Sequence, residues 1–277
     1  MIENFHSKWY FYYMKNKGVV IMKTKMILFL SVILVLTGCS KSNVVINGKS
    51  DLDGKKIGVQ AGTTGELFVE ENIPGAQVAS FKSGIDAALA LKNGDIDCVI
   101  LDELPAEEIV KRNPSLKIIR DPYFAENKEE YAIAVKKGNT ELLAKIDETI
   151  NEMKKNGEYE QLVNAFMPAD GIIQIPENIV TNGQTVVLGT NAAFPPFEYV
   201  EGKKIVGFDI TMGQKIAKTA KMKLEVLDMA FDSLIPALQA GTIDFIAAGM
   251  SVTEERKKNV DFSVPYFASE QVIIVRK

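Results

Sequence analysis

An eight-residue pattern that occurs twice constrains the fold of this chain most strongly. The pattern Ala-Leu-x-x-Gly-x-Ile-Asp, where x is any residue, spans residues 90–97 and recurs at residues 237–244. In each copy we expect a helix to end at the glycine, which adopts a left-handed backbone readily. An apolar strand then follows at 98–101 or 245–248. A helix followed by a buried strand in both halves predicts an α/β fold built from two similar units.

Each half also contains an earlier apolar strand that runs into a small, polar loop. The first of these strands is predicted at residues 56–59 and the second at residues 186–188. Ligands of open α/β sheets bind beyond the carboxyl ends of the strands. The loops after all four strands are therefore expected to face a ligand cleft between two sheets.

Packing helices and a linker are predicted between the halves. Asn139 caps an amphipathic helix that ends at Gly157, and a second helix follows through Tyr159 to Phe166. Residues 168–184 contain turn-forming residues without hydrophobic periodicity, which indicates a linker.

The first 38 residues have the pattern of a lipoprotein signal peptide. A basic start after Met22 precedes an apolar run at residues 26–36 and then Leu-Thr-Gly-Cys. The run is too short for a membrane-spanning helix. We expect Cys39 to be the lipidated first residue and residues 39–50 to form a tether. Residues 17–19 can be encoded by a sequence that resembles a ribosome-binding site, which favours Met22 as the true start.

Composition excludes several classes of function. His6 and Trp9 are the only histidine and tryptophan, and both lie in the leader. Without imidazole, a zinc site or a serine-histidine or cysteine-histidine pair is not expected. The first 38 residues hold five lysines and one glutamate, so the totals of 32 basic and 36 acidic residues leave a net charge of −8 afterwards. Nucleic acid is therefore an unexpected partner. Cys98 lies in an apolar strand and is predicted to be inert core.

Several segments resemble the polar amino-acid-binding proteins of ABC importers. Residues 189–199, 206–209 and 248–256 carry the resemblance, and residues 261–266 and 51–65 extend it over most of the chain. The order differs from that of the family, in which the counterpart of 189–199 precedes the counterpart of 51–65. The chain therefore resembles a circularly permuted member.

The resemblance implies a two-lobed α/β fold of the periplasmic-binding-protein (Venus-flytrap) type, with the lobes in permuted order. Residues 51–130 are expected to form the smaller lobe and 131–277 the larger, with 168–184 joining the original ends. One chain crossing is expected, near Glu130. The alternative is a fragment that joins the tail of one binding protein to the head of the next. An intact signal peptide directly before a lobe boundary argues against it.

The resemblance also implies which residues hold the two ends of an amino acid. Arg256 is expected to bind the carboxylate, helped by Ser251 and Gly249 of the same loop. The alternative is a solvated arginine within a charged run. Asp102 is expected to bind the ammonium group, although its position also suits a helix cap.

Further residues are expected to surround the ligand side chain or complete the cleft. Phe194 and Phe231 are expected to sandwich the side chain. Thr63 and Thr64 are expected to donate hydrogen bonds to the carboxylate from the other lobe. The amides of Asn191 and Gln60 favour a ligand with an uncharged polar side chain. The alternative of a ligand with a cationic side chain, held by the phenyl faces of Phe194 and Phe231, stays open.

The implied function is that of a monomeric, lipid-anchored receptor on the extracytoplasmic face of the membrane. It would capture a free polar amino acid by cleft closure and present it to ABC permease subunits, without a cofactor or metal and without catalysis. Two alternatives stay open. One is an enzyme similar to cyclohexadienyl dehydratase on the same fold, and the other is a stand-alone amino-acid sensor.

Overall fold

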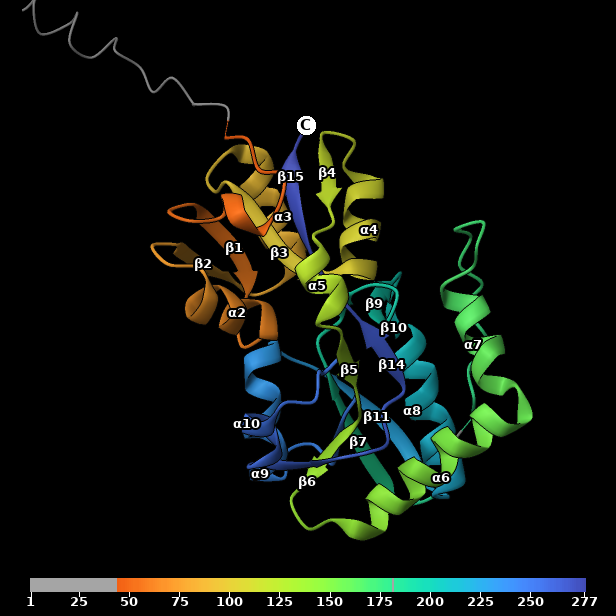
Figure 1. Ribbon diagram of the computed structural model, residues 1–277. Helices are drawn as coiled ribbons and strands as arrows, with labels where there is room; N and C mark the ends of the chain where they lie inside the picture. The colour runs from red at the N-terminus through yellow and green to blue at the C-terminus, as the bar shows by residue number, and fades with distance from the viewer. Residues whose placement is uncertain (1–43, 181) are drawn as a thin grey trace, which may run out of the picture. The chain divides into compact units, whose positions relative to one another are not determined.

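The two predicted α/β units form two five-stranded sheets with helices on their faces (Figure 1). The computed structural model describes residues 44–180 and 182–277, of which Val45–Lys277 pack as one unit. The predicted signal peptide and the lipidation site Cys39 lie outside the described residues. In the part of the chain that is described, no helix is long and apolar enough to cross a membrane.

The first sheet and its helices are called the small lobe here. Its strand order is β2-β1-β3-β15-β4, with β1 parallel to β2 and β3, and β15 antiparallel to both β3 and β4. The strands are β1 (Lys56–Gln60), β2 (Gln77–Phe81), β3 (Cys98–Asp102), β4 (Leu116–Ile119) and β15 (Gln271–Arg276). The helices are η1 (Lys49–Asp51), α2 (Thr64–Asn72), α3 (Gly84–Asn93), α4 (Glu103–Arg112) and α5 (Pro122–Glu126).

The second sheet and its helices are called the large lobe. Its strand order is β11-β7-β12-β6-β13. These strands are β6 (Ala134–Lys136), β7 (Thr185–Thr190), β11 (Lys223–Asp228), β12 (Phe245–Ile246) and β13 (Val260–Phe262). A separate three-stranded sheet contains β8 (Ala193–Phe194), β9 (Glu198–Glu201) and β10 (Lys204–Val206). The helices are α6 (Thr140–Asn156), α7 (Glu158–Phe166), α8 (Phe208–Thr219), η2 (Phe231–Ser233), α9 (Leu234–Ala240) and α10 (Glu254–Lys257).

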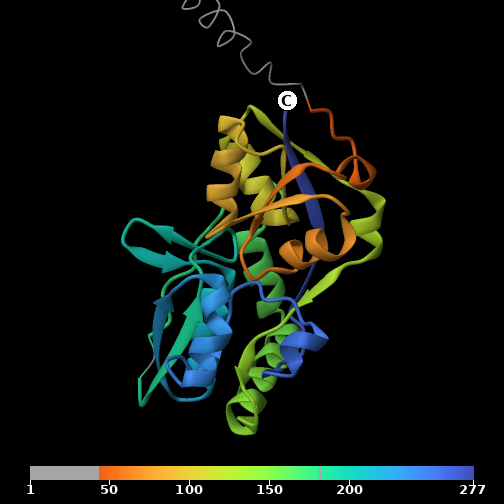
Figure 2. The same ribbon diagram turned by 90° about the vertical axis from the view of Figure 1, so that its left-hand side faces the viewer.

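The chain crosses between the lobes twice, which corrects the predicted single crossing. The crossings are β5 (Glu129–Tyr131) and β14 (Phe267–Ser269), which pair antiparallel with each other. After β14 the chain returns to the small lobe, where β15 lies between β3 and β4 (blue among yellow elements in Figures 1 and 2). The apolar residues 272–275 are buried, and only the middle of a sheet covers both faces of such a strand. Residues 270–277 therefore belong with 51–130 and not with the larger lobe.

The local predictions about helix ends are confirmed. Helices α3 and α9 end at Gly94 and Gly241, which have φ of 79° and 77°. The side chain of Asn139 caps α6 by accepting a hydrogen bond from the backbone N–H of Leu142.

Cys98 is fully buried in β3, and burial followed by the charge of Asp97 raises its thiol pKa to about 12. The predicted position of Cys98 in the core is confirmed, and a raised thiol pKa disfavours the reactive thiolate.

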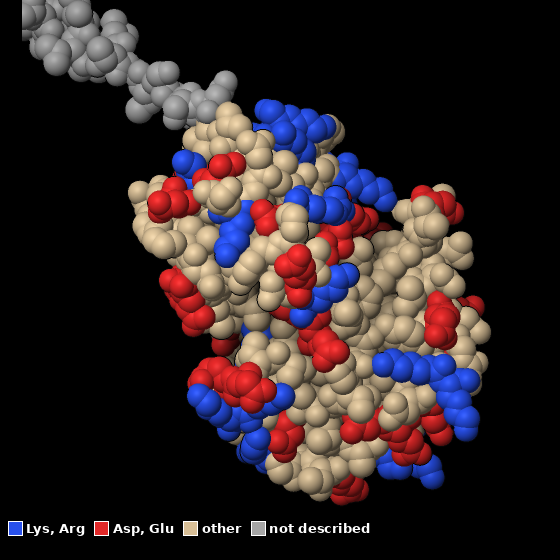
Figure 3. All heavy atoms as spheres, viewed as in Figure 1, with Lys and Arg blue, Asp and Glu red and all other residues tan. Residues whose placement is uncertain are grey.

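The predicted linker contains no helix or strand over its described residues, 168–180 and 182–184. It touches the small lobe, because the Nζ of Lys111 on α4 donates to the carbonyl of Gly171 at 2.9 Å. Lysine, arginine and acidic side chains are interspersed over the face shown in Figure 3.

Candidate functional site

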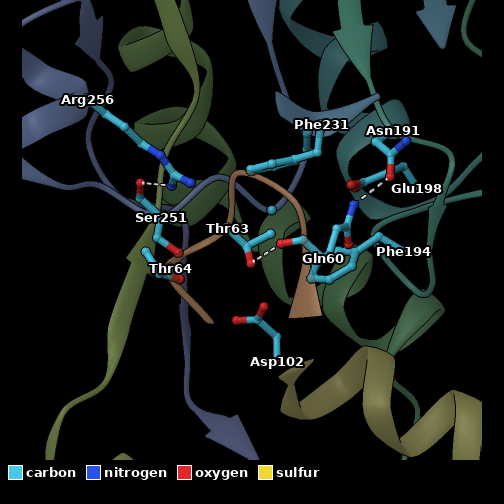
Figure 4. A pocket seen from close by; sticks show the side chains of 12 residues that line it. Gln60, Thr63, Thr64, Asp102, Asn191, Phe194, Glu198, Phe231, Ser251 and Arg256 are labelled. Carbon is cyan, nitrogen blue, oxygen red and sulfur yellow. Dashed lines mark hydrogen bonds between the residues drawn. The ribbon is translucent and has the colours of Figure 1, made fainter. Parts of the chain in front are cut away.

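A small pocket lies where the strand ends of the two lobes meet (Figure 4). All ten residues that the sequence predicts as ligand contacts line it, and Glu198 and Ala248 complete the wall. The predicted ten are Gln60, Thr63, Thr64 and Asp102 from the small lobe and Asn191, Phe194, Phe231, Gly249, Ser251 and Arg256 from the large lobe. The free space is about 10 Å³, the room that about one water molecule needs.

Hydrogen bonds between the lobes close this pocket. The Nε2 of Gln60 donates to the Oδ1 of Asn191 at 2.9 Å, and Nη2 of Arg256 donates to the carbonyl of Gly62 at 2.9 Å. Both bonds join residues from opposite lobes. An amino acid is far larger than the free space, so its entry requires these contacts to separate.

Arg256 is a buried residue, which makes the alternative of a solvated arginine wrong. Its exposed fraction is 8%, and Nη1 donates to the carbonyl of Ser251 at 2.6 Å. The guanidinium carbon lies 5.4 Å from the ring centroid of Phe231, within the range of a cation–π contact. Burial lowers the pKa of Arg256, and the nearby acids Glu129 and Asp102 oppose that change. A buried guanidinium with few anionic contacts is well suited to a ligand carboxylate.

Asp102 ends β3 and directs its carboxylate into the pocket (Figure 4). The helix-cap alternative is not realised, because the side chain makes no capping hydrogen bond to α4. Its Oδ1 instead accepts from Gln271 Nε2 at 3.2 Å and from Ser269 Oγ at 3.4 Å. Burial, followed by the charge of Glu129, raises the pKa of Asp102 to about 7. A cation beside this carboxylate would be strongly favoured.

The raised pKa of Asp102 predicts how the free energy of unfolding depends on pH. Between the ordinary pKa near 4 and the folded-state pKa of about 7, Asp102 is protonated in the folded state and ionised in the unfolded state. The free energy of unfolding therefore rises as pH falls from about 7 to about 4. At about pH 8 we expect Asp102→Asn to raise the melting temperature of the ligand-free protein by about 3–8 °C. The difference should shrink as pH falls through this interval and vanish only near pH 4, the ordinary pKa of an aspartate. Thermal melts at both pH values test this, with the exposed Asp95→Asn as control; a destabilised Asp102→Asn at pH 8 would contradict it.

Glu198 is a pocket residue that the sequence reasoning missed. It begins β9, its side chain is fully buried, and neither carboxylate oxygen accepts a hydrogen bond from a donor group among the described residues; its side-chain partner is the acid Asp209, and a hydrogen bond between the two acids requires a shared proton. Burial, followed by the charge of Asp209, raises the pKa of Glu198 well above its usual range. Asp209 itself is held by the hydroxyl of Tyr266 at 2.7 Å and the N–H of Gly249 at 2.9 Å. The available signal was an acid within the apolar and aromatic segment 189–199.

The aromatic residues and the glycine shape the pocket wall. Phe194 and Phe231 are 7% and 9% exposed, and the ring of Phe194 stacks on Phe197 with centroids 5.8 Å apart. Gly249 has φ of +53°, and a Cβ there would lie 2.6 Å from the ring of Phe194. A larger residue at position 249 would therefore displace that ring.

The hydroxyls of the small-lobe loop are already engaged within the protein. Thr63 caps α2 by accepting from the N–H of Glu66, and its Oγ1 donates to the carbonyl of Gln60 at 2.8 Å. Thr64 donates to Glu129 at 2.7 Å, and Ser251 donates to the same carboxylate. Glu129 is a second residue that the sequence reasoning missed. Within the described residues, no cluster of three or more potential ligands could hold a metal ion.

Comparison with known proteins finds relatives that are named as amino-acid-binding proteins. The curated relatives include the arginine-binding extracellular protein ArtP of Bacillus subtilis (46% identity over 92 residues, 33% of this chain and 36% of the relative). ABC transporter arginine-binding protein 1 of Escherichia coli is 37% identical over 95 residues, 34% of this chain and 39% of the relative. The L-cystine-binding protein TcyJ of Escherichia coli is 32% identical over 126 residues, 45% and 46% of the two chains. The chain thus spans less than half the length of each of these relatives.

Solved structures match over similarly short stretches. An ancestral arginine-binding protein bound to arginine is 53% identical, covering 31% of this chain and 38% of that chain with a TM-score of 0.30. The arginine-bound form of domain 1 from TmArgBP is 44% identical, covering 34% and 80% with a TM-score of 0.30.

A family model accounts for most of the chain. The model described as bacterial extracellular solute-binding proteins, family 3, matches residues 9–169 and 186–277. The two matched segments flank the region predicted as a linker, and together they contain every predicted site residue. This chain therefore belongs to the bacterial extracellular solute-binding proteins, family 3.

Proposed function

We propose that this protein binds a free amino acid with a cationic side chain, such as arginine, between its two lobes. The observation that carries the proposal is Glu198, a buried acid on the pocket wall that accepts no hydrogen bond from a donor group among the described residues and whose side-chain partner is another acid, Asp209. A buried carboxylate of this kind is costly unless it stays protonated or meets a cation. Phe194 and Phe231 add ring faces that also favour a cation. The names of the arginine-binding relatives support the same ligand class.

In this proposal the three ends of the ligand meet three kinds of residue. Arg256 binds the carboxylate, Asp102 binds the ammonium group, and Glu198 faces the cationic side chain. The expectation that Gln60 and Asn191 recognise the ligand side chain is revised, because their amides hydrogen-bond to each other. Their role in the proposal is to join the lobes around the ligand.

Binding and closure are coupled through Arg256. In the closed arrangement its guanidinium bonds to the Gly62 carbonyl of the opposite lobe, and a ligand carboxylate takes over this contact. A ligand that contacts both lobes shifts the equilibrium between open and closed forms toward the closed form. We propose that the permease subunits of an ABC importer recognise that form. The naming of several relatives as ABC transporter binding proteins supports this partner.

The permuted order and the lipid anchor are part of the proposal. The segments that resemble the family occur in exchanged order, and residues 168–184 join α7 to β7 where the original ends would meet. Cys39 would carry the lipid, which places the protein on the extracytoplasmic face of the membrane. Two chain crossings are compatible with a permuted chain, because each lobe keeps a complete sheet.

A binding role is preferred over a dehydratase-like enzyme. Such an enzyme needs a protonated acid in the pocket, and Asp102 has a pKa of about 7. The relatives named above are binding proteins, however, and the conjunction of Arg256, Asp102 and Glu198 matches the charges of a cationic amino acid.

A melting screen tests the proposed function. We expect arginine at one hundred times its dissociation constant to stabilise the native state by about 2.7 kcal/mol, which raises the melting temperature by about 5–10 °C. Each of the twenty amino acids is added separately, and unfolding is followed with an external dye. Neutral and acidic amino acids serve as controls and should give smaller shifts. A cooperative melt that no amino acid moves would overturn the proposed function.

A further inference from the structure

Glu129 lies behind the pocket wall, on β5 where the chain crosses between the lobes. Its Oε2 accepts the hydroxyl proton of Thr64 at 2.7 Å and that of Ser251 in a second bond. Thr64 begins α2 of the small lobe, and Ser251 belongs to the large lobe. Both hydroxyl-bearing residues line the pocket, whereas Glu129 does not. Figure 4 shows the side chains of Thr64 and Ser251 next to each other at the wall.

The direction of these hydrogen bonds decides what the hydroxyls can offer a ligand. A hydroxyl has one proton and two acceptor lone pairs. Thr64 and Ser251 both direct their proton to Glu129, so only their lone pairs can face the pocket. A ligand carboxylate is also an acceptor and gains nothing from them. An ammonium group has three N–H donors and does.

The surroundings hold this arrangement in place. The amide of Gln271, on β15, donates to the Oδ1 of Asp102 at 3.2 Å and to both Glu129 Oε1 and Thr64 Oγ1 at 3.4 Å. The bond to Thr64 uses one of its lone pairs and leaves the other for the pocket. Gln271 is 4% exposed, so these bonds are screened from water. The network links the Asp102 carboxylate to the two hydroxyls from behind the wall.

We propose that Glu129 is a positioning residue for the α-ammonium group of the ligand. It turns the oxygens of Thr64 and Ser251 toward the pocket, where they and the Asp102 carboxylate supply three acceptors for three N–H donors. The inference rests on the proposed function and reverses the expectation that Thr64 donates to the ligand carboxylate.

Glu129→Gln tests the inference, because a glutamine amide can donate to a hydroxyl and release its proton toward the pocket. We expect the dissociation constant for arginine to rise about 10- to 100-fold. The constant for 5-guanidinopentanoate, which is arginine without its amino group, should change less than about 3-fold. Glu130→Gln, an exposed neighbour on the same strand, is the matched control and should leave both constants unchanged. Thr64→Val removes one acceptor and should give the same selective loss, even if Glu129→Gln does not fold.

The outcomes separate this inference from the proposed function. An equal loss for both ligands would show a general structural role and overturn the inference. Tighter binding of 5-guanidinopentanoate by Glu129→Gln would also overturn it, because Glu129 would then compete with the ligand carboxylate for the hydroxyls. If the unaltered protein binds neither ligand, the proposed function fails and the inference fails with it.

Discussion

We expect Arg256→Ala to weaken arginine binding at least about 30-fold, because truncation of one partner of a buried, hydrogen-bonded charge pair costs about 2–5 kcal/mol. Among the described residues that line the pocket, Arg256 carries the one cationic group, and no other offers a planar guanidinium to a carboxylate. Arg256→Lys keeps the charge without the planar fork, so we expect it to recover only part of the affinity. Titration calorimetry of the three proteins measures the differences.

The same change also affects stability, since Arg256 is buried. Its removal leaves the carbonyl of Ser251 without this donor, which we expect to cost about 1–3 kcal/mol. Binding is therefore compared at a temperature well below both melting transitions. Lys257→Ala, an exposed neighbour on α10, is the matched control and should bind arginine normally. Unchanged arginine affinity in a folded Arg256→Ala protein would contradict the site.

Glu198→Gln is expected to have the second large effect. The amide is nearly isosteric but uncharged, so we expect arginine binding to weaken about 30- to 300-fold, the equivalent of about 2–3.4 kcal/mol. Citrulline, which replaces the guanidinium of arginine by a neutral urea group, should bind the two proteins within about 3-fold. Competition titrations at about pH 8 check both values.

The ligand-free Glu198→Gln protein should also be more stable than the unaltered protein above neutral pH. Burial, followed by the charge of Asp209, raises the pKa of Glu198 in the folded state, so the free energy of unfolding falls as pH rises from the ordinary value near 4.5 toward that raised pKa, and the amide avoids this loss. Glu201→Gln, at the exposed end of the same strand, is the control for both measurements. Equal losses of arginine and citrulline affinity would show that Glu198 does not recognise the positive charge of the ligand side chain.

The sequence predicted the strand-end loops because each rule involved is local. A glycine that must end a helix, an asparagine that caps one and an apolar run that enters a sheet are all visible within a few residues. The general rule for ligand crevices then placed the loops together. The family resemblance supplied the ten individual residues, which line one pocket from both lobes.

The remaining features depend on contacts between distant parts of the chain. Strand β15 lies between β3 and β4, a pairing of residues 154–175 positions apart along the chain. Its apolar run is compatible with either lobe, and the family order favoured the wrong one. The burial of Glu198 depends on its packing near Asp209, and Gln60 meets Asn191 across 131 positions. Neither contact leaves a periodic signal in the sequence.

Titration calorimetry of the unaltered protein with arginine and then with citrulline tests the central claim most directly. We expect arginine to bind one to one with a dissociation constant of about 1 μM or lower, which corresponds to about 8 kcal/mol, and citrulline to bind at least about 30-fold more weakly. Equal affinity for the two ligands, or no heat of binding with arginine, would contradict a pocket in which Arg256, Asp102 and Glu198 hold a cationic amino acid.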